Sequence, residues 1–371
     1  MKTKARVIAF YLPQYHPIPE NDEWWGKGFT EWTNVGKAKP LFRGHYQPRI
    51  PADLGYYDLR LPIIREQQAE MAREAGIEGF CYWHYWFGNG KTLLAEIFDE
   101  VLTSGKPDFP FCLGWANHSW TRKNWNAVDA KNASDPNLLL QKYPGEEDHI
   151  NHFYNVLPAF KDKRYITVDG KPLFVIYRPL DLPNPKHFFS LWNKLAKENG
   201  LKGIHFVGII SGFYPDEFDR FFELGFDGLT FENYRNITQH MYGGAFFART
   251  VRRIRNKFPK IPPEIHDYKK AINYWLTEYD KRENCYPSIL PQWDPSPRRT
   301  HNVLILKNST PDLFKKHVEN ALEHIKHKSQ EHQILFLKSW NEWAEGNYME
   351  PDLVFGHGYL NALREVIVEE S

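Results

Sequence analysis

Three glutamates stand close together in the sequence, shortly after an apolar run near the end of the chain. The run is Ile334–Leu337, and the glutamates are Glu342, Glu345 and Glu350. A core strand has no packing reason to end in carboxylates, because an unpaired buried carboxylate is costly. A site that cleaves a glycosidic bond has such a reason, because it needs one carboxyl group to donate a proton and another to act as base or nucleophile. These residue types indicate carbohydrate chemistry.

The spacing of Glu342 and Glu345 suits such a pair. If the chain turns tightly after Trp340, residues three apart face the same side. We then expect the two carboxyl groups to lie roughly 5–5.5 Å apart, as in retaining glycosidases. The alternative is an exposed loop with solvated glutamates, and the neighbouring Trp and Asn residues argue against it.

The two carboxyl groups need different pKa values. We expect Glu345 to keep a proton near neutral pH, because Trp340 and Trp343 would desolvate it and negative charge on Glu342 would disfavour its ionisation. We expect Glu342 to stay ionised, with hydrogen-bond donors from Asn341 and Tyr348.

Aromatic and polar side chains also gather near the ends of other apolar runs. Flat rings bind the C–H faces of sugars, and amides and imidazoles hydrogen-bond sugar hydroxyls. The candidate substrate-binding residues are Tyr11, Gln14, His16, Trp32, Tyr82, Trp83, His84, Trp115, Asn117, Trp120, Tyr177, Glu232, Asn233, Gln292, Trp293, Trp340, Asn341, Trp343, Tyr348 and Glu350. Because side chains alternate along a strand, about half of the rings on each strand must point away from any pocket.

The elements that position these residues follow from the hydrophobic pattern. The expected strands are 7–12, 79–82, 111–115, 173–177, 205–210, 228–231, 287–292 and 334–340. They alternate with helical patterns, and eight such units predict an α/β fold, a single (β/α)8 TIM barrel over residues 1–371 with a long first βα loop at 13–57. The candidate residues then lie at the C-terminal ends of the strands, where such barrels build their active sites.

Two local expectations belong to this scheme. A helix is expected at 268–279, after an irregular basic stretch that reaches Pro263, and Thr310 is expected to cap the next helix, with Pro311 at its first position. The alternative fold is an open doubly wound sheet. The first strand is followed by Leu12–His16 instead of a glycine-rich phosphate loop, which argues against that alternative.

Composition limits the function further. The charged fraction is 25% and the net charge is +1, so the overall balance gives no electrostatic case for nucleic acid or an anionic membrane surface. Three cysteines argue against a disulfide framework and favour a reducing compartment. No signal peptide and no stretch long enough to span a bilayer stand out, and we expect a cytoplasmic protein without an integral membrane segment.

Metal and cofactor chemistry lack a motif in this sequence. There is no H-E-x-x-H and no Cys/His ligand spacing, so we expect no metal and no cofactor. The basic run from Arg249 to Lys257 is typical of a solvated helix face. The alternatives are contact with an anionic sugar, a lipid-linked phosphate or a membrane surface.

Two stretches resemble the WbsX-like proteins found with bacterial polysaccharide loci. The first is Ala9–His16 together with Gly28–Trp32, and the second is Trp340–Gly346 with Glu350-Pro351. The resemblance runs over nearly the whole chain. That family is similar in turn to glycoside hydrolase family 99, the (β/α)8 endo-α-mannosidases, in its fold and in the final motif.

The resemblance implies a retaining glycosidase acting on an oligosaccharide or polysaccharide. In family 99 one carboxylate deprotonates the sugar 2-hydroxyl, which attacks the anomeric carbon to give a 1,2-anhydro sugar, and a second carboxylate three residues on protonates the leaving group and later activates water. Carried over, Glu342 is the base and Glu345 the acid/base. Ala344 stands where that family has His, so α-mannoside specificity does not follow. The alternatives are a glycosyltransferase of O-antigen or capsular polysaccharide biosynthesis and a non-catalytic glycan-binding barrel.

Overall fold

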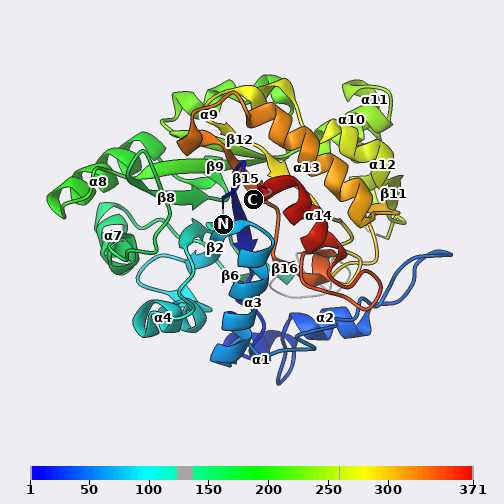
Figure 1. The fold of residues 1–371 in the computed structure, drawn as a ribbon, viewed down its shortest axis with the longest axis horizontal. Coiled ribbons are helices and arrows are strands. Elements are labelled where there is room, and N and C mark those ends of the chain that lie inside the picture. Colours follow the sequence, from blue (N-terminus) through cyan, green and yellow to red (C-terminus); the bar gives the residue numbers. More distant parts are fainter. Residues whose placement is uncertain (1, 123–136, 259, 370–371) are drawn as a thin grey trace.

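A ring of parallel strands forms the centre of the computed structural model, which describes residues 2–122, 137–258 and 260–369 (Figure 1). The strands of the ring are β1 (Arg6–Tyr11), β2 (Ile77–Trp86), β4 (Phe111–Trp115), β8 (Lys171–Ile176), β9 (His205–Ser211), β10 (Gly228–Glu232), β12 (Cys285–Tyr286), β13 (Ser288–Ile289) and β15 (Ile334–Leu337). Their apolar side chains are almost wholly buried, as expected for parallel strands covered on both faces.

The ring closes through two short strands that share one position. β12 pairs with β10, and β13 pairs with β15. Pro287 lies between them and has no N–H to donate, but its carbonyl accepts a hydrogen bond from Phe336 N at 2.9 Å. The expected seventh strand at 287–292 therefore begins two residues earlier and ends at Ile289. With β12 and β13 counted as one position, the eight-stranded TIM barrel is confirmed.

Helices surround the ring (Figure 1). They are α1 (Pro19–Trp25), α2 (Glu31–Lys37), α3 (Pro62–Glu74), α4 (Ala95–Ser104), α7 (Glu146–Phe160), α8 (Pro185–Glu198), α9 (Asp219–Glu223), α10 (Tyr234–Met241), α11 (Ala245–Lys257), α12 (Tyr268–Ala271), α13 (Pro311–Ile325) and α14 (Gly358–Ile367). The expected cap of α13 is present, because the Thr310 side chain accepts from Leu313 N at 3.3 Å and Pro311 begins the helix.

Short strands and 3-10 turns complete the described chain. The strands are β3 (Thr92–Leu93), β5 (Trp120–Thr121), β6 (Asn137–Leu139), β7 (Thr167–Val168), β11 (Glu264–Asp267), β14 (Leu304–Lys307), β16 (Asn341–Glu342) and β17 (Asn347–Tyr348). The turns are η1 (Pro179–Asp181), η2 (Pro215–Glu217), η3 (Ile272–Tyr274), η4 (Glu278–Lys281), η5 (Gln330–His332) and η6 (Trp343–Glu345). None of the described helices has both the length and the apolar character needed to cross a membrane.

One local expectation was wrong. The helix expected at 268–279 is broken into α12, η3 and η4, because the carbonyls of Tyr274 and Trp275 accept from the side chains of Asn236 and Asn233 instead of continuing a helix. The basic stretch described as irregular contains helix α11, which agrees with the interpretation of the run Arg249 to Lys257 as a helix face.

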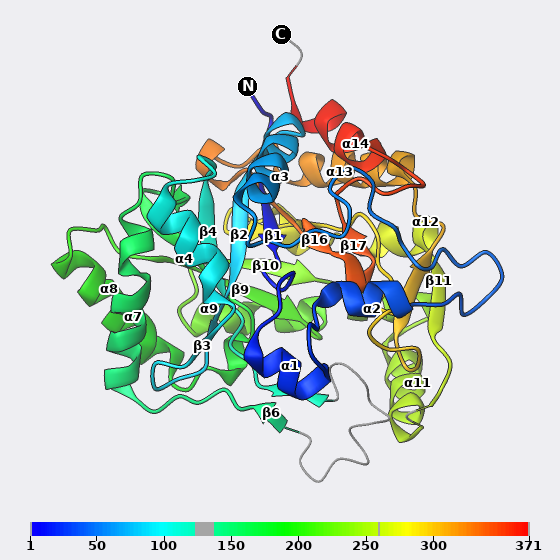
Figure 2. The ribbon, with the colours of Figure 1, turned by 90° about the horizontal axis from the view of Figure 1, so that it is seen from below.

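The long first loop folds over one end of the barrel. It carries α1 and α2, and Figure 2 shows both helices on the side opposite the two chain termini. Glu31, the first residue of α2, is fully buried. The C-terminal ends of the barrel strands point toward this side, so the loop helps to build the mouth of the barrel.

Candidate active site

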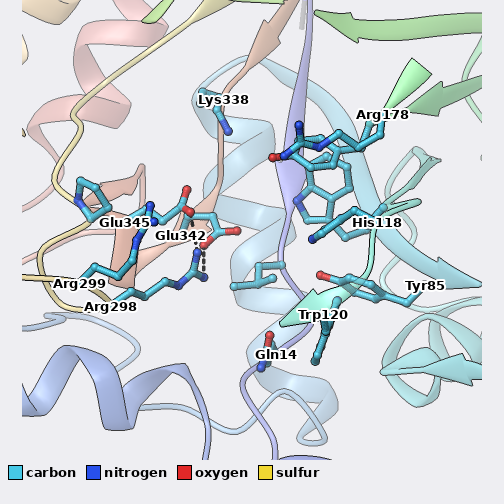
Figure 3. A pocket seen from close by; sticks show the side chains of 15 residues that line it. Gln14, Tyr85, His118, Trp120, Arg178, Arg298, Arg299, Lys338, Glu342 and Glu345 are labelled. Atoms are coloured by element: carbon cyan, nitrogen blue, oxygen red, sulfur yellow. Dashed lines mark hydrogen bonds and ion pairs between the residues drawn. The ribbon is translucent and has the colours of Figure 1, made fainter. Parts of the chain in front are cut away.

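A cavity of about 280 Å³ opens at the C-terminal ends of the strands (Figure 3). It is lined by Leu12, Gln14, Trp83, Tyr85, Ala116, His118, Trp120, Tyr177, Arg178, Pro295, Arg298, Arg299, Lys338, Glu342 and Glu345. The lining thus combines four aromatic rings, four cations and the two glutamates that the sequence singles out as a pair.

A tight turn after β15 brings the two glutamates together. Glu342 caps the 3-10 turn η6, and Glu345 is its last residue. Residues three apart eclipse each other in a 3-10 helix, so both side chains leave the turn on one side. Gly346 ends the turn at φ 54°, and a Cβ there would lie 2.8 Å from Asp294 Cβ, so this position requires glycine.

One guanidinium joins the two carboxyl groups. Arg298 donates from Nη2 to Glu342 at 2.7 Å and from Nη1 to Glu345 at 2.6 Å, and Figure 3 shows both contacts. Arg298 Nη2 also lies 3.1 Å from Glu31 Oε1. Because the planar guanidinium of Arg298 contacts all three side chains, it holds the carboxyl groups of Glu342 and Glu345 next to each other.

Three carboxyl groups surround a single guanidinium, and this excess of negative charge favours the protonated form of a carboxyl group. Burial raises the pKa of Glu342 to about 8, against the lowering effect of Arg298, and negative charge on Glu345 and Glu31 adds to the increase. Burial also raises the pKa of Glu31, while Arg298 opposes the change. At neutral pH the cluster therefore holds a proton together with at least one carboxylate.

The expectation that Glu342 stays ionised was wrong for a structural reason. The side chain of Asn341 is bonded to the backbone of Leu12, accepting from its N–H at 2.8 Å and donating to its carbonyl at 3.0 Å. The hydroxyl of Tyr348 donates to Asp352 at 2.5 Å. Both expected donors are thus bound elsewhere, and burial determines the pKa of Glu342.

The tryptophans of the motif surround a different carboxyl group. The indole N–H groups of Trp340 and Trp343 donate to Glu350 at 3.0 and 2.6 Å, so they do not form the expected walls around Glu345. Gln68 and Tyr57 also donate to Glu350, at 2.6 and 2.9 Å. Burial raises the pKa of Glu350 to about 7. This buried hydrogen-bond network stabilises the turn η6.

The sequence-predicted residues divide into two sets. Gln14, Trp83, Trp120, Tyr177, Glu342 and Glu345 line the cavity. Tyr11, His16, Trp32, Tyr82, His84, Trp115, Asn117, Glu232, Asn233, Gln292, Trp293, Trp340, Asn341, Trp343, Tyr348 and Glu350 are not part of its lining. The structure thus brings the catalytic candidates together with four of the twenty proposed substrate-binding residues.

Residues of the second set bind other parts of the protein. The hydroxyl of Tyr11 donates to Gln68 at 2.7 Å, and the Asn117 amide donates to the carbonyl of Arg178 at 2.9 Å. His84 Nε2 lies 2.9 Å from His152 Nε2, and burial lowers the pKa of His84 to about 4. Within the described residues, no group of three or more His, Cys, Asp or Glu side chains could hold a metal ion.

Glu232 and Trp293 lie just behind the lining. The carboxylate of Glu232 is 2.9 Å from Lys338 Nζ, and that ammonium lies over the ring of Trp293, 5.7 Å from its centroid. Neither residue lines the cavity, but both contact Lys338, which does.

Several residues of the site were missed by sequence reasoning. They are Glu31, Tyr85, Arg178, Arg298, Arg299 and Lys338. Glu31 stands within the Gly28–Trp32 motif, which was a usable signal. Arg298 carries none, because it follows strand β13 in a loop and is joined to the glutamates only by folding.

A closed parallel barrel with paired carboxyl groups at its mouth defines a glycoside hydrolase-like fold. Solved structures share it over nearly the whole chain. A "Glycoside hydrolase-like protein" matches with a TM-score of 0.61 at 16% identity, covering 99% of this chain and 94% of that one. A GH99 endo-alpha-mannosidase from Bacteroides thetaiotaomicron matches with a TM-score of 0.53 at 15% identity, covering 99% and 96%.

The chain belongs to the WbsX family. The model of that family, described as "Glycosyltransferase WbsX", matches residues 7–363. "Uncharacterized protein WxcX" from Xanthomonas campestris pv. campestris strain B100 is 34% identical over 365 residues, and its counterpart in a second strain is equally similar. The match covers 98% of this chain, which spans about half the length of these relatives.

Proposed function

We propose that this chain is a retaining glycoside hydrolase that cleaves α-linked, mannoside-like or related glycosides of a bacterial polysaccharide or glycan. One observation carries the proposal: Arg298 holds Glu342 and Glu345 together in a cavity lined by aromatic rings. Paired carboxyl groups supply acid and base catalysis for glycosidic bond cleavage. The rings of Trp83, Trp120 and Tyr177 supply flat apolar surface for a sugar.

The roles of the pair follow the family 99 pattern. Glu342 removes the proton of the sugar 2-hydroxyl, and the resulting oxygen attacks the anomeric carbon while Glu345 protonates the departing glycosidic oxygen. This gives a 1,2-anhydro sugar and the released alcohol. Glu345, now ionised, then takes a proton from water, whose oxygen opens the anhydro ring, and the 2-oxygen recovers its proton from Glu342. Each carboxyl group ends in its starting state, with configuration retained.

The raised pKa of Glu342 adds one requirement to this scheme. Glu342 favours its protonated form at neutral pH, whereas its role as base requires the ionised form. A sugar 2-hydroxyl that donates a hydrogen bond to Glu342 stabilises that ionised form. We therefore infer that substrate binding promotes the ionisation of Glu342.

Aromatic surface and hydrogen-bonding groups complete the substrate site. Gln14 and His118 offer polar groups to sugar hydroxyls from the wall that Figure 3 shows facing the glutamates. Ala344, which stands where family 99 has His, is fully buried between the two glutamates. The α-mannoside specificity of family 99 is therefore not carried over to this chain, whereas the bond type and the stereochemical course are.

A glycosyltransferase is the second candidate, favoured by the name of the family model. The two candidates differ in what they consume. A hydrolase cleaves a glycan in the presence of chelator and without a nucleotide sugar, whereas a transferase extends an acceptor only when a sugar donor is supplied.

The test is a screen of defined bacterial and fungal glycans, with products identified by mass spectrometry and their anomeric configuration by NMR. We expect hydrolysis that is insensitive to chelator and gives an initial product of retained configuration. Products that appear only with a nucleotide sugar would overturn the proposal in favour of the transferase, and initial inversion would overturn the neighbouring-group mechanism.

A further inference from the structure

Helix α11 lies in a strongly basic part of the chain that the proposed reaction does not use. Between Asn233 and Pro263 the sequence has no Asp or Glu, although the whole chain has a net charge of only +1. The cations of this stretch are Arg235, Arg249, Arg252, Arg253, Arg255, Lys257 and Lys260. The rest of the chain is therefore net negative, and the positive charge is concentrated around one helix.

The same helix exposes large apolar side chains. Phe246 and Phe247 in its first turn are 75% and 59% exposed, Ile254 is 50% exposed, and Phe258 at its C-cap is 58% exposed. At 3.6 residues per turn, Phe246, Phe247 and Ile254 fall within an arc of about 100° around the helix axis, and Phe258 follows them at the C-cap. We call these four residues the apolar stripe of α11. An isolated exposed apolar residue is ordinary, but a stripe of four is not.

Another side of α11 packs against neighbouring parts of the chain. Ala248 is buried, and the Arg255 guanidinium donates to the carbonyl of Pro262 at 2.6 Å and lies 3.9 Å from Glu264. The apolar stripe is therefore not the packing face of the helix.

We propose that α11 docks this protein onto an anionic lipid bilayer. A helix with cations beside an exposed apolar stripe binds a membrane interface by burying the apolar side chains at the level of the lipid headgroups, while the cations meet the negative surface. Exposed Arg253 and Lys257, which lie beside Phe246 around the helix axis, provide this charge complementarity. A second copy of the chain fits less well, because a symmetric contact through α11 would bring two basic helices together. Nucleic acid would leave the stripe unexplained.

The position of α11 determines which side of the docked protein faces the lipid surface. The helix follows β10 and α10 in the chain, and Figure 2 shows it at the outer edge of the molecule on the same side as α1. Docking holds the mouth side of the barrel beside the lipid surface, with the two termini on the far side. The proposal does not depend on catalysis.

Co-sedimentation with lipid vesicles tests the proposal directly. The full chain is mixed with vesicles of phosphatidylcholine alone or with added phosphatidylglycerol. We expect binding only to the anionic vesicles and weaker binding as salt is added. Phe246→Ser with Phe247→Ser removes half of the stripe, and Arg253→Gln with Lys257→Gln removes the two cations beside it. Each cation near an anionic surface is worth about fivefold in affinity, so the charge variant should bind roughly 25-fold more weakly.

Matched variants on other surfaces serve as controls. Leu353→Ser with Val354→Ser changes two side chains that are 66% and 58% exposed, far from α11 in sequence, and should leave binding unchanged. Far-ultraviolet circular dichroism and thermal melting confirm that each variant is folded. Wild-type protein that binds both vesicle types equally, or α11 variants that bind as the wild type does, would overturn the proposal. A concentration-dependent dimer that the Phe246 and Phe247 substitutions abolish would instead assign the stripe to self-association.

Discussion

Arg298 is the residue on which the geometry of the candidate site depends. It contacts Glu31, Glu342 and Glu345 at once, so it fixes the positions of both catalytic candidates and limits their mutual repulsion. Its own pKa is raised well above the usual value, because the effect of the three carboxyl groups exceeds that of burial. Arg298 thus acts as a positioning residue that remains charged throughout.

Replacing Arg298 by Gln should impair catalysis through the pair. The amide cannot hold two carboxyl groups in register, and a small misplacement of reacting groups can reduce turnover on the order of 10²-fold. Arg298 lowers the pKa of Glu342, so its loss should move the alkaline limb of the pH–rate profile to higher pH. Arg299→Gln, a change at the neighbouring lining residue, is the matched control. An Arg298→Gln variant with wild-type turnover and an unshifted profile would contradict this role.

The pKa of Glu342 predicts the pH dependence of the reaction. The pair needs one proton to give to the leaving group, and that proton is lost as the pH rises through about 8. We therefore expect kcat/KM to fall above about pH 8. The measurement is kcat/KM against pH on one cleaved glycan. A rate that increases through pH 8 would show that catalysis requires the pair fully ionised.

The alternation of side chains along a strand determines which aromatic rings can contact a sugar. On β2, Trp83 and Tyr85 point into the cavity, whereas Tyr82, His84 and Trp86 point outward to α4 and α7. The sequence shows the alternation and cannot show its phase, because both faces of a parallel barrel strand are apolar or aromatic. This is why only part of the predicted binding set lines the cavity.

Trp83 and Trp115 form a matched pair for testing this division. Trp83 lines the cavity and stacks on Phe10 with 4.9 Å between ring centroids. Trp115 is fully buried among His152 and Phe188. Trp83→Ala should weaken glycan binding roughly tenfold with little loss of stability. Trp115→Ala should lower the free energy of unfolding by about 3–5 kcal/mol.

Chemical denaturation and glycan titration of the two variants separate the effects. Each variant should be strongly affected in one measurement and nearly unaffected in the other. If Trp83→Ala unfolds as readily as Trp115→Ala, the ring of Trp83 belongs to the core and the proposed substrate surface is wrong.

At the scale of the whole molecule, the alternation of apolar runs and helical patterns was sufficient to predict the barrel. Each run forms a strand near its expected place, although β2 extends to Trp86, four residues beyond its expected end, and Pro287 interrupts the seventh strand. Spacing also placed Glu342 and Glu345 together, because a local turn joins them. Arg298 could not be added to the site in this way, since it lies in a loop after β13 and only folding brings that loop to the glutamates.

The most direct test of the account compares Glu342→Gln and Glu345→Gln with the wild type on one natural glycan and one activated glycoside. Glutamine preserves shape and removes the transferable proton, so each variant should lose on the order of 10²–10⁴-fold in turnover on the natural glycan while still binding it. The defect of Glu345→Gln should shrink on the activated glycoside, whose leaving group needs less protonation, and that of Glu342→Gln should not. Wild-type turnover in both variants, or a wild-type protein that binds glycans and cleaves none, would contradict the catalytic assignment.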